Sequence, residues 1–236
     1  MPNNPIPYWR TGGFEPQALI SGRHDLSREE VLASQRGRIM RGALYELGSR
    51  GANPMTVASV VAHAKVSKKT FYETFDGLDE CVREAVQTLN VVAGGEMARA
   101  AREADPSQLF GRLHAVSLEL LESARDEPIL TTGLLAPGFG LETPGAGEWA
   151  LYGEIRSKML IAWYDDERNR TADLPETTLP RAMAAFAAFE YSILRSLAAG
   201  KQDELPAQVE DIVNLIVGIL SNGGVEYRLL AQEGHH

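Results

Sequence analysis

The chain has 236 residues, of which 44% are hydrophobic and 23% charged, and its formal net charge at pH 7 is -9. This hydrophobic content is enough for one large core or two modest ones. The single cysteine, Cys81, excludes an intramolecular disulfide, and no apolar run approaches the length of a membrane span. The first residues, MPNNPIPYWRTGG, lack the basic start and apolar stretch of a secretory signal, so we expect a cytoplasmic protein with no membrane partner.

The charge is distributed unevenly along the chain. Residues 1–75 contain 10 Lys and Arg against 6 Asp and Glu, whereas residues 76–236 contain 13 against 26. Local rather than net charge governs contact with phosphates. The N-terminal part is therefore the part suited to bind a nucleic acid.

The N-terminal residues 1–27 are rich in Pro, Gly and Asn and are predicted to form a mobile arm. Arginines in this arm could reach a DNA minor groove, or the arm could be an unstructured tail. Ser27 and Glu30 form a capping-box pattern that begins the first helix, and Gly51 ends it.

Residues 56–75, TVASVVAHAKVSKKTFYETF, are the most informative part of the sequence. Thr56 is predicted to cap a first short helix, and Ser67 a second, whose Phe71 and Phe75 share an inward face. The outward residues are then Lys68, Lys69 and Tyr72. Lysines bind phosphates or guanine in a major groove, where a tyrosine hydroxyl can hold a backbone oxygen. The pattern predicts a DNA-binding helix-turn-helix; the alternative is an αα-hairpin with solvated lysines.

The stretch from Arg36 to Phe75 resembles the DNA-binding domain of the TetR family of bacterial transcriptional regulators. The matching residues are Arg36, Ile39, Ala43, Gly51, Thr56, Val57, Ala64, Val66, Ser67, Thr70, Phe71, Tyr72 and Phe75. The resemblance implies a DNA-binding domain over residues 28–77 and a ligand-binding and dimerisation domain over residues 78–236. The residues expected to contact operator DNA are Arg36, Thr56, Ser67, Lys68, Lys69, Thr70 and Tyr72.

Three positions depart from the family pattern. Lys65 stands at the turn where the family usually has glycine, and a left-handed conformation there costs about 1 kcal/mol for a residue with a side chain. Val61 replaces a usual alanine, which affects the spacing of the two helices. Leu78 stands where the family often has a lysine that contacts phosphate, so one anchoring contact is expected to be missing.

Two further helices and a loop are predicted in the middle of the chain. Apolar spacing predicts one helix from Leu78 to about Glu103, through Gly94-Gly95, and another from about Gln108 to Arg125. The first of these links the two domains in the TetR family. Because residues 131–147 are rich in Gly and Pro, they are predicted to form a loop.

The helix predicted from about Glu148 to Arg168 carries an aromatic stripe. On one face, at spacings of three and four, it places Trp149, Tyr152, Arg156, Met159 and Trp163. The stripe is either packed core or a pocket wall, and large rings mixed with an arginine favour the wall. The residues expected to face it are His114, Ser117, Phe186, Phe189 and Glu190. The predicted ligand is a small hydrophobic or aromatic effector.

The last two long helices are predicted to be unusually small-sided and apolar. The helix from about Pro180 to Ala199 contains Ala182, Ala184, Ala185, Ala187, Ala188, Ala198 and Ala199. The next contains Val209, Ile212, Val213, Ile216, Val217, Ile219 and Leu220. A helix apolar on more than one face needs cover on two sides, from its own subunit or from another. The resemblance implies a homodimer through these helices, which would present two recognition helices to a palindromic operator.

Enzyme motifs are absent from the sequence. It contains no HExxH, GxSxG, Walker or CxxC pattern, so we predict no catalytic residue, metal site or cofactor. We predict an all-α transcriptional regulator, a repressor that a small-molecule effector releases from double-stranded operator DNA. The alternative is a helical small-molecule or lipid-binding protein, or an enzyme, that does not bind DNA and has no use for an exposed Lys-Lys-Tyr face.

Overall fold

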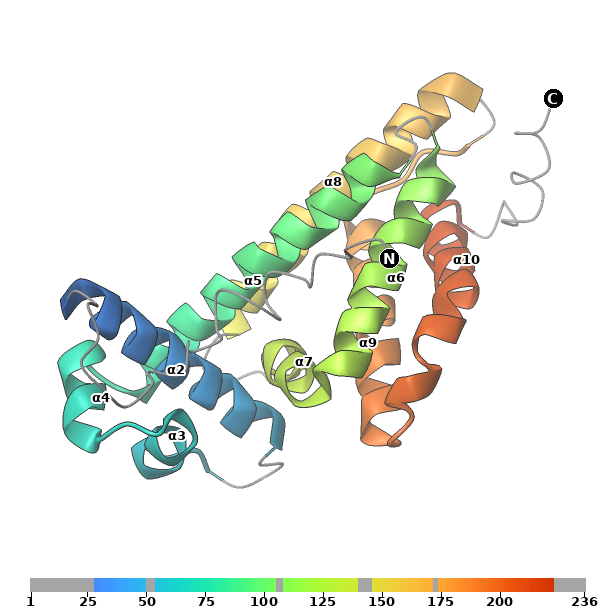
Figure 1. Cartoon of the computed structure of the whole chain (residues 1–236). Helices are drawn as coiled ribbons and strands as arrows, with labels where there is room; N and C mark the ends of the chain where they lie inside the picture. Colours follow the sequence, from blue (N-terminus) through green and yellow to red (C-terminus); the bar gives the residue numbers. More distant parts are fainter. Residues whose placement is uncertain (1–27, 50–53, 105–107, 140–145, 172–173, 223–236) are drawn as a thin grey trace, which may run out of the picture. The chain divides into compact units, whose positions relative to one another are not determined.

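The computed structural model describes residues 28–49, 54–104, 108–139, 146–171 and 174–222. Within these ranges the chain forms helices and no strands (Figure 1), which confirms the predicted all-α fold. The predicted N-terminal arm, Ser27 of the capping box and Gly51 lie outside the described residues. None of the described helices combines the length and apolar character needed to cross a bilayer.

The described helices form two compact units. Of the described residues, unit 1 contains those up to Ala93 and those from Ile129 to Trp149, and unit 2 contains those from Gly94 to Pro128 and from Ala150 onward. The boundary between the two units, as defined by packing contacts, lies at Gly94, inside a helix that runs without a break from Leu78 to Glu103. The functional boundary at residue 78 stays a prediction.

Unit 1 is built around three helices and the start of a fourth. These are α2 (Arg28–Ser49), α3 (Val57–Ala64), α4 (Lys68–Thr74) and the first part of α5 (Leu78–Glu103). Helix α2 packs against both α3 and α4. The core consists of apolar side chains with almost no exposed surface: Ile39, Leu44, Val60, Phe71, Phe75, Val82 and Val86. Phe71 and Phe75 therefore share the inward face predicted for them.

Helix α7 (Pro128–Leu135) and a short 3-10 helix (Ala136–Phe139) also belong largely to unit 1. The loop predicted over residues 131–147 is therefore wrong for residues 131–139, and for 146–147, which begin α8. Pro128 is the first residue of α7, a position where proline is tolerated because a backbone N–H there would have no partner within the helix. Gly133 is tolerated because α7 meets α2 there; a β-carbon on it would lie closer than 3.0 Å to the carbonyl oxygen of Leu44.

Unit 2 contains the rest of α5 and four further helices. These are α6 (Leu109–Asp126), α8 (Ala146–Thr171, from Ala150), α9 (Leu179–Ala198) and α10 (Val209–Leu220). Helix α10 packs against α9 and α6 (Figure 1). Helices α6, α8 and α9 agree with the predicted spans to within a few residues, and α10 contains all the apolar residues named for the last predicted helix.

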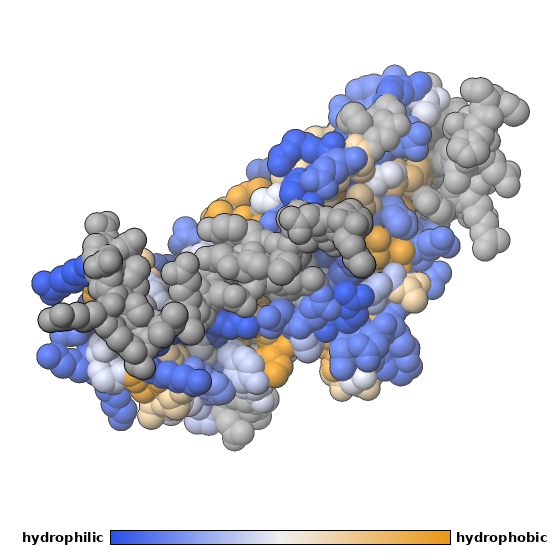
Figure 2. All heavy atoms as spheres, viewed as in Figure 1, coloured by the Kyte–Doolittle hydropathy of each residue, from blue (hydrophilic) through white to orange (hydrophobic). Residues whose placement is uncertain are grey.

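Most of the apolar side chains of α10 are covered inside unit 2. The buried ones are Val209, Ile212, Val213, Ile216, Val217 and Leu220. The apolar pattern of α10 is thus explained largely within one subunit. Large apolar side chains that remain exposed on α9 and α10 are Met183, Tyr191 and Leu215. On the face shown in Figure 2, hydrophilic side chains cover most of the described surface, with smaller hydrophobic areas between them.

Candidate DNA-binding face and apolar cavity

The two short helices of unit 1 begin at the caps that the sequence predicts. The Thr56 hydroxyl accepts a hydrogen bond from the backbone N–H of Ser59 at 3.1 Å, as one half of a capping box. The Ser67 hydroxyl accepts one from the N–H of Thr70 at 3.0 Å. These bonds satisfy N–H groups that a helix start otherwise leaves without a partner.

The turn between α3 and α4 is closed by a lysine in a left-handed conformation. Lys65 has φ 53° and ψ 46°, so it adopts the left-handed conformation that a glycine usually takes at this turn. Its N–H donates to the carbonyl oxygen of Ala62, and the next N–H, of Val66, donates to that of Val61 at 3.2 Å. These hydrogen bonds close the turn although a side chain in this conformation costs about 1 kcal/mol.

Helix α4 buries one side and exposes the other. Phe71 is fully buried, whereas Tyr72 is 61% exposed and its ring meets the Phe71 ring edge-on at 5.4 Å. Lys68 and Lys69 are also exposed, and Lys69 lies 3.7 Å from Glu73, one turn further along. We call the exposed residues Ser67, Lys68, Lys69 and Tyr72 the α4 face.

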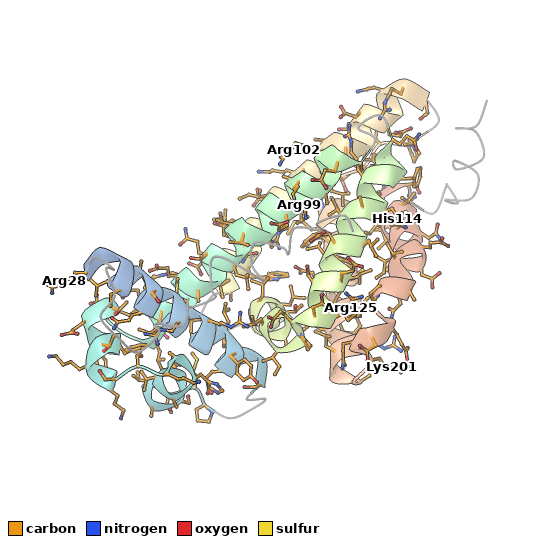
Figure 3. All side chains as sticks on the ribbon, in the orientation of Figure 1. Arg28, Arg99, Arg102, His114, Arg125 and Lys201 are labelled. Atoms are coloured by element: carbon orange, nitrogen blue, oxygen red, sulfur yellow. The ribbon has the colours of Figure 1, made fainter. Side chains whose placement is uncertain are left out.

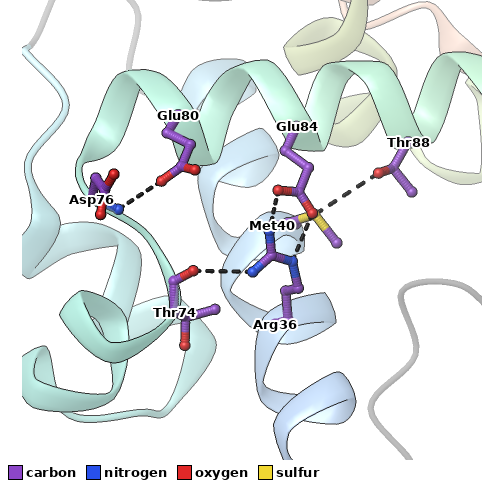
Figure 4. A network of polar contacts seen from close by, with 7 residues as sticks. All are labelled: Arg36, Met40, Thr74, Asp76, Glu80, Glu84 and Thr88. Atoms are coloured by element: carbon purple, nitrogen blue, oxygen red, sulfur yellow. Dashed lines mark hydrogen bonds and ion pairs between the residues drawn. The ribbon is translucent and has the colours of Figure 1, made fainter.

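Arg36, expected to contact DNA, makes several contacts within unit 1. Its Nε donates to Glu84 of α5 at 2.6 Å, its Nη2 forms an ion pair with the same carboxylate, and its Nη1 donates to the carbonyl oxygen of Thr74 at 3.0 Å (Figure 4). The guanidinium also lies 4.5 Å from the ring centre of Phe75. The hydrogen bonds with Glu84 raise the pKa of Arg36. In this setting Arg36 joins α2 to the end of α4 and to α5, while its contact with DNA stays a prediction.

Unit 2 contains an apolar cavity of about 30 Å³, room for about one or two water molecules. Its lining residues come from every long helix of the unit: Met97, Leu113, Val116, Ser117, Leu120, Arg156, Met159, Leu160, Trp163, Phe186, Phe189 and Ile216. Six of the predicted ligand residues are among them: Ser117, Arg156, Met159, Trp163, Phe186 and Phe189. The structure thus brings together most of the aromatic stripe and its predicted partners.

The one ionisable side chain that lines this cavity within the described residues is Arg156. It is 7% exposed and lies 3.8 Å from the carboxylate of Glu190, which is 2% exposed and stands outside the lining. Its guanidinium also lies 5.4 Å from the ring centre of Phe186. Burial lowers the pKa of Arg156, and the charge of Glu190 opposes this effect. Arg156 and Glu190 together form a buried pair with no net charge.

Besides Glu190, three predicted ligand residues do not line the cavity. His114 of α6 (Figure 3) and Tyr152 are both partly exposed and stand outside the lining. Trp149 belongs to unit 1, where its ring occupies the space beside Gly138 that a β-carbon would need. The residues of the α8 stripe thus lie on one helix face, but Trp149 belongs to unit 1 and the others belong to unit 2.

Half of the cavity lining is absent from the predicted site. Leu113, Val116 and Leu120 recur at spacings of three and four on α6, a pattern equally typical of plain core packing. Met97 of α5 and Ile216 of α10 carry no signal in sequence that separates them from other apolar neighbours. The apolar pattern of α10 suggested Ile216 for a subunit interface, but it is buried within unit 2 and lines the cavity.

Comparison with known proteins adds information on the fold. No protein-family model matches the chain, and no curated protein matches it. Among solved structures, it is similar to the fatty acid degradation regulator FadR from Bacillus halodurans, with 12% identity and a TM-score of 0.68 over 78% of this chain and 95% of the other. It is also similar to a Clostridium perfringens protein to which regulation of fatty acid metabolism is ascribed, with 16% identity and a TM-score of 0.55 over 80% and 98%. At these identities the likeness establishes a shared fold.

Proposed function

We propose that the chain is a ligand-responsive, DNA-binding transcription regulator of the TetR type. It acts in the cytoplasm as a homodimeric repressor that leaves a palindromic operator when a small hydrophobic or aromatic effector binds. The observation that carries this proposal is the α4 face: a helix begun by the Ser67 cap, anchored by buried Phe71, and exposing two lysines and a tyrosine. The two solved structures with this fold are of proteins described as regulators, which supports a regulator rather than an enzyme.

The chemistry of the α4 face suits a DNA major groove. Lys68 and Lys69 neutralise phosphates or donate to guanine, and the Tyr72 hydroxyl donates to a phosphate oxygen. The exposed hydroxyl groups of Thr56 and Ser67 stand at the two helix starts, where backbone N–H groups also favour phosphate. Thr70 is half-buried and hydrogen-bonded to Ser67 at 2.9 Å, so it supports the helix start beside any contact it makes.

The proposed homodimer is formed through the exposed side of α9 and α10. Met183, Ala187 and Tyr191 recur every four residues on α9, and Met183 and Tyr191 are 44% and 58% exposed. Leu215 of α10 is 40% exposed. Alanines between the large side chains let two helices approach closely. Leu215→Glu should therefore yield monomers in sedimentation experiments, whereas the matched change Leu151→Glu, at an exposed leucine of α8, should leave dimers.

The proposed effector binds in the apolar cavity of unit 2. A molecule larger than about two waters must displace lining side chains, and the role in fatty acid metabolism that is described for the two neighbours fits a hydrophobic effector. An effector that prefers the DNA-incompetent state must bind less tightly when DNA is bound, since coupling is reciprocal. Trp163→Ala should then lose the effector response while retaining operator binding.

The decisive experiment tests the α4 face on DNA selected by the wild-type protein from random duplexes. Lys68→Ala with Lys69→Ala should weaken binding and reduce the slope of log affinity against log salt by about two phosphate equivalents. The matched control, Lys158→Ala with Lys201→Ala, removes the same charge from exposed lysines of unit 2 and should change neither.

Three outcomes of this experiment contradict the regulator proposal. The first is that the wild-type protein selects no DNA sequence. The second is that the double variant of the α4 face binds DNA as tightly as the wild type, and the third is that the control variant loses as much affinity as the α4-face variant. A protein that binds apolar ligands but no DNA would instead be a helical ligand-binding protein. Thermal melting of each variant confirms that the fold is intact.

A further inference from the structure

A second hollow lies on the outside of unit 2, against the wall of the apolar cavity. This groove has a volume of about 340 Å³ and is lined by residues of α5, α6 and α8: Ala98, Ala101, Arg102, Arg112, Met159 and Trp163. Met159 and Trp163 also line the cavity of about 30 Å³. These two side chains therefore separate the cavity from the groove.

This shared wall is suited to open. Met159 and Trp163 are only partly buried, and both pack with Phe186 and Leu120 against a small cluster around Met97 and Val116. Methionine has an unbranched, flexible side chain that adapts to irregular spaces. Trp163 can leave its place by rotation about two side-chain bonds. Other parts of the lining, such as Leu160 and Phe189, are buried in the unit and are not among the residues that line the groove.

The groove combines a small apolar floor with basic side chains. Ala98 and Ala101 leave room above α5, and Arg102 projects outward from the same helix (Figure 3). Arg112 of α6 is 12% exposed and lies 3.5 Å from Asp166 of α8. Arg102 and Arg112 are the charged residues among those that line the groove, so its lining favours an anion, and the solvent at the groove keeps the desolvation cost low.

The buried Arg156 is a poorer place for an anionic group. Its charge is already balanced by Glu190 at 3.8 Å, so an added anion would give the cavity a net negative charge. An uncompensated charge in a closed apolar site is far more costly than a charge at a solvated rim. An anionic ligand is therefore expected to leave its head in the groove and place its apolar part in the cavity.

We propose that the α5–α6–α8 groove is the access route and head-group site of an effector that has an anionic head and an apolar tail. Met159 and Trp163 form the gate through which the tail enters the cavity, and Arg102 and Arg112 bind the head. This inference rests on the proposed role of the cavity in effector binding. It adds the class of effector, the direction in which it enters and the residues that select its charge.

The head-group site is tested by calorimetry with four probes that share a ten-carbon chain: decanoate, decyl phosphate, decanol and decyltrimethylammonium. Both anions should bind more tightly than decanol, and the cation most weakly; the tighter of the two anions tells a carboxylate head from a phosphate head. Arg102→Gln should weaken the anions by about threefold, and Arg102→Gln with Arg112→Gln by about tenfold, with decanol unchanged. The matched control Arg83→Gln, at another exposed arginine of α5, should have no effect. Equal affinity for all heads, an equal loss for decanol, or no binding of any probe overturns the proposal.

The gate is tested by stopped-flow tryptophan fluorescence. Met159→Ala should raise the association and dissociation rates of decanoate by about threefold or more, because it removes half of the wall. Met97→Ala is the matched control: Met97 lines the cavity but not the groove, so its loss should change affinity with little change in association rate. Equal acceleration by both variants, or none by Met159→Ala, shows that the tail enters elsewhere.

The outcomes separate this inference from the proposed regulator role. Loss of the groove effects with DNA binding intact removes only the access route. A protein that binds decanoate through the groove but selects no DNA sequence would leave the groove assignment standing and overturn the regulator.

Discussion

Replacing Gly133 by alanine should test the contact between α2 and α7 in unit 1. A β-carbon at Gly133 would lie closer than 3.0 Å to the carbonyl oxygen of Leu44, and one at Gly48 would lie equally close to that of Ile129. Backbone atoms rather than flexible side chains occupy both spaces. The two helices must separate by about 1 Å to admit a methyl group, in an interior that is otherwise close-packed.

The expected free-energy change is the balance of two effects. Overpacking of this kind costs about 1–3 kcal/mol and more where backbone must move. Alanine in place of glycine inside a helix gains about 1 kcal/mol. Gly133→Ala should therefore lower the free energy of unfolding by about 1–2 kcal/mol, which corresponds to a fall of about 2–8 °C in Tm for a chain of this size.

Urea denaturation and thermal melting measure this change against matched controls. Gly94→Ala and Gly153→Ala are also changes inside helices, but no atom lies within 4 Å of the added carbon in either case. Both controls should therefore raise the free energy of unfolding, by up to about 1 kcal/mol. If Gly133→Ala stabilises the protein as the controls do, the close contact between α2 and α7 does not exist in solution.

Two further predictions concern buried polar groups. Glu190→Leu alone should lower the free energy of unfolding by about 3–5 kcal/mol, because it removes the carboxylate that balances Arg156. Adding Arg156→Met should recover much of this loss. Urea titrations that find the double variant no more stable than the single variant would refute the argument. Burial raises the pKa of Cys81 from 9.0 to about 12, so a thiol reagent at pH 8 should react only as the protein unfolds. Since the unfolded thiol ionises first, the stability that Cys81 contributes is complete below pH 9 and declines as the pH rises toward 12; rapid labelling of the native protein contradicts this.

Local signals were enough to predict the helices and the form of the α4 face. The hydroxyl caps at Thr56 and Ser67, the left-handed position at Lys65 and the inward pair Phe71 and Phe75 all act over a few residues. Each of these features depends only on the backbone geometry within one or two helical turns. For the same reason, the exposure of Lys68, Lys69 and Tyr72 follows from the spacing alone.

Contacts between distant segments could not be predicted in this way. Arg36 matched a family position expected near DNA, but only the fold places Glu84, 48 residues away, beside its guanidinium. The segment after Pro128 was predicted as a loop from its glycines, yet Gly133 is the residue that lets α7 pack on α2. A glycine in a sequence indicates either a flexible backbone or a place where another segment packs closely. Only the position of the neighbouring segment in the fold distinguishes the two.

The sequence by itself determined the all-α class, the helix-turn-helix and the stripe of Arg156, Met159 and Trp163, because helical periodicity and capping depend on near neighbours. Tertiary structure decided which members of the stripe meet a cavity, since Trp149 lies on the same helix face but belongs to the other unit. It also decided that Ile216 faces inward and that Arg156 is balanced by Glu190. Burial and charge pairing are set by side chains that arrive from other helices, and spacing along one helix does not specify them.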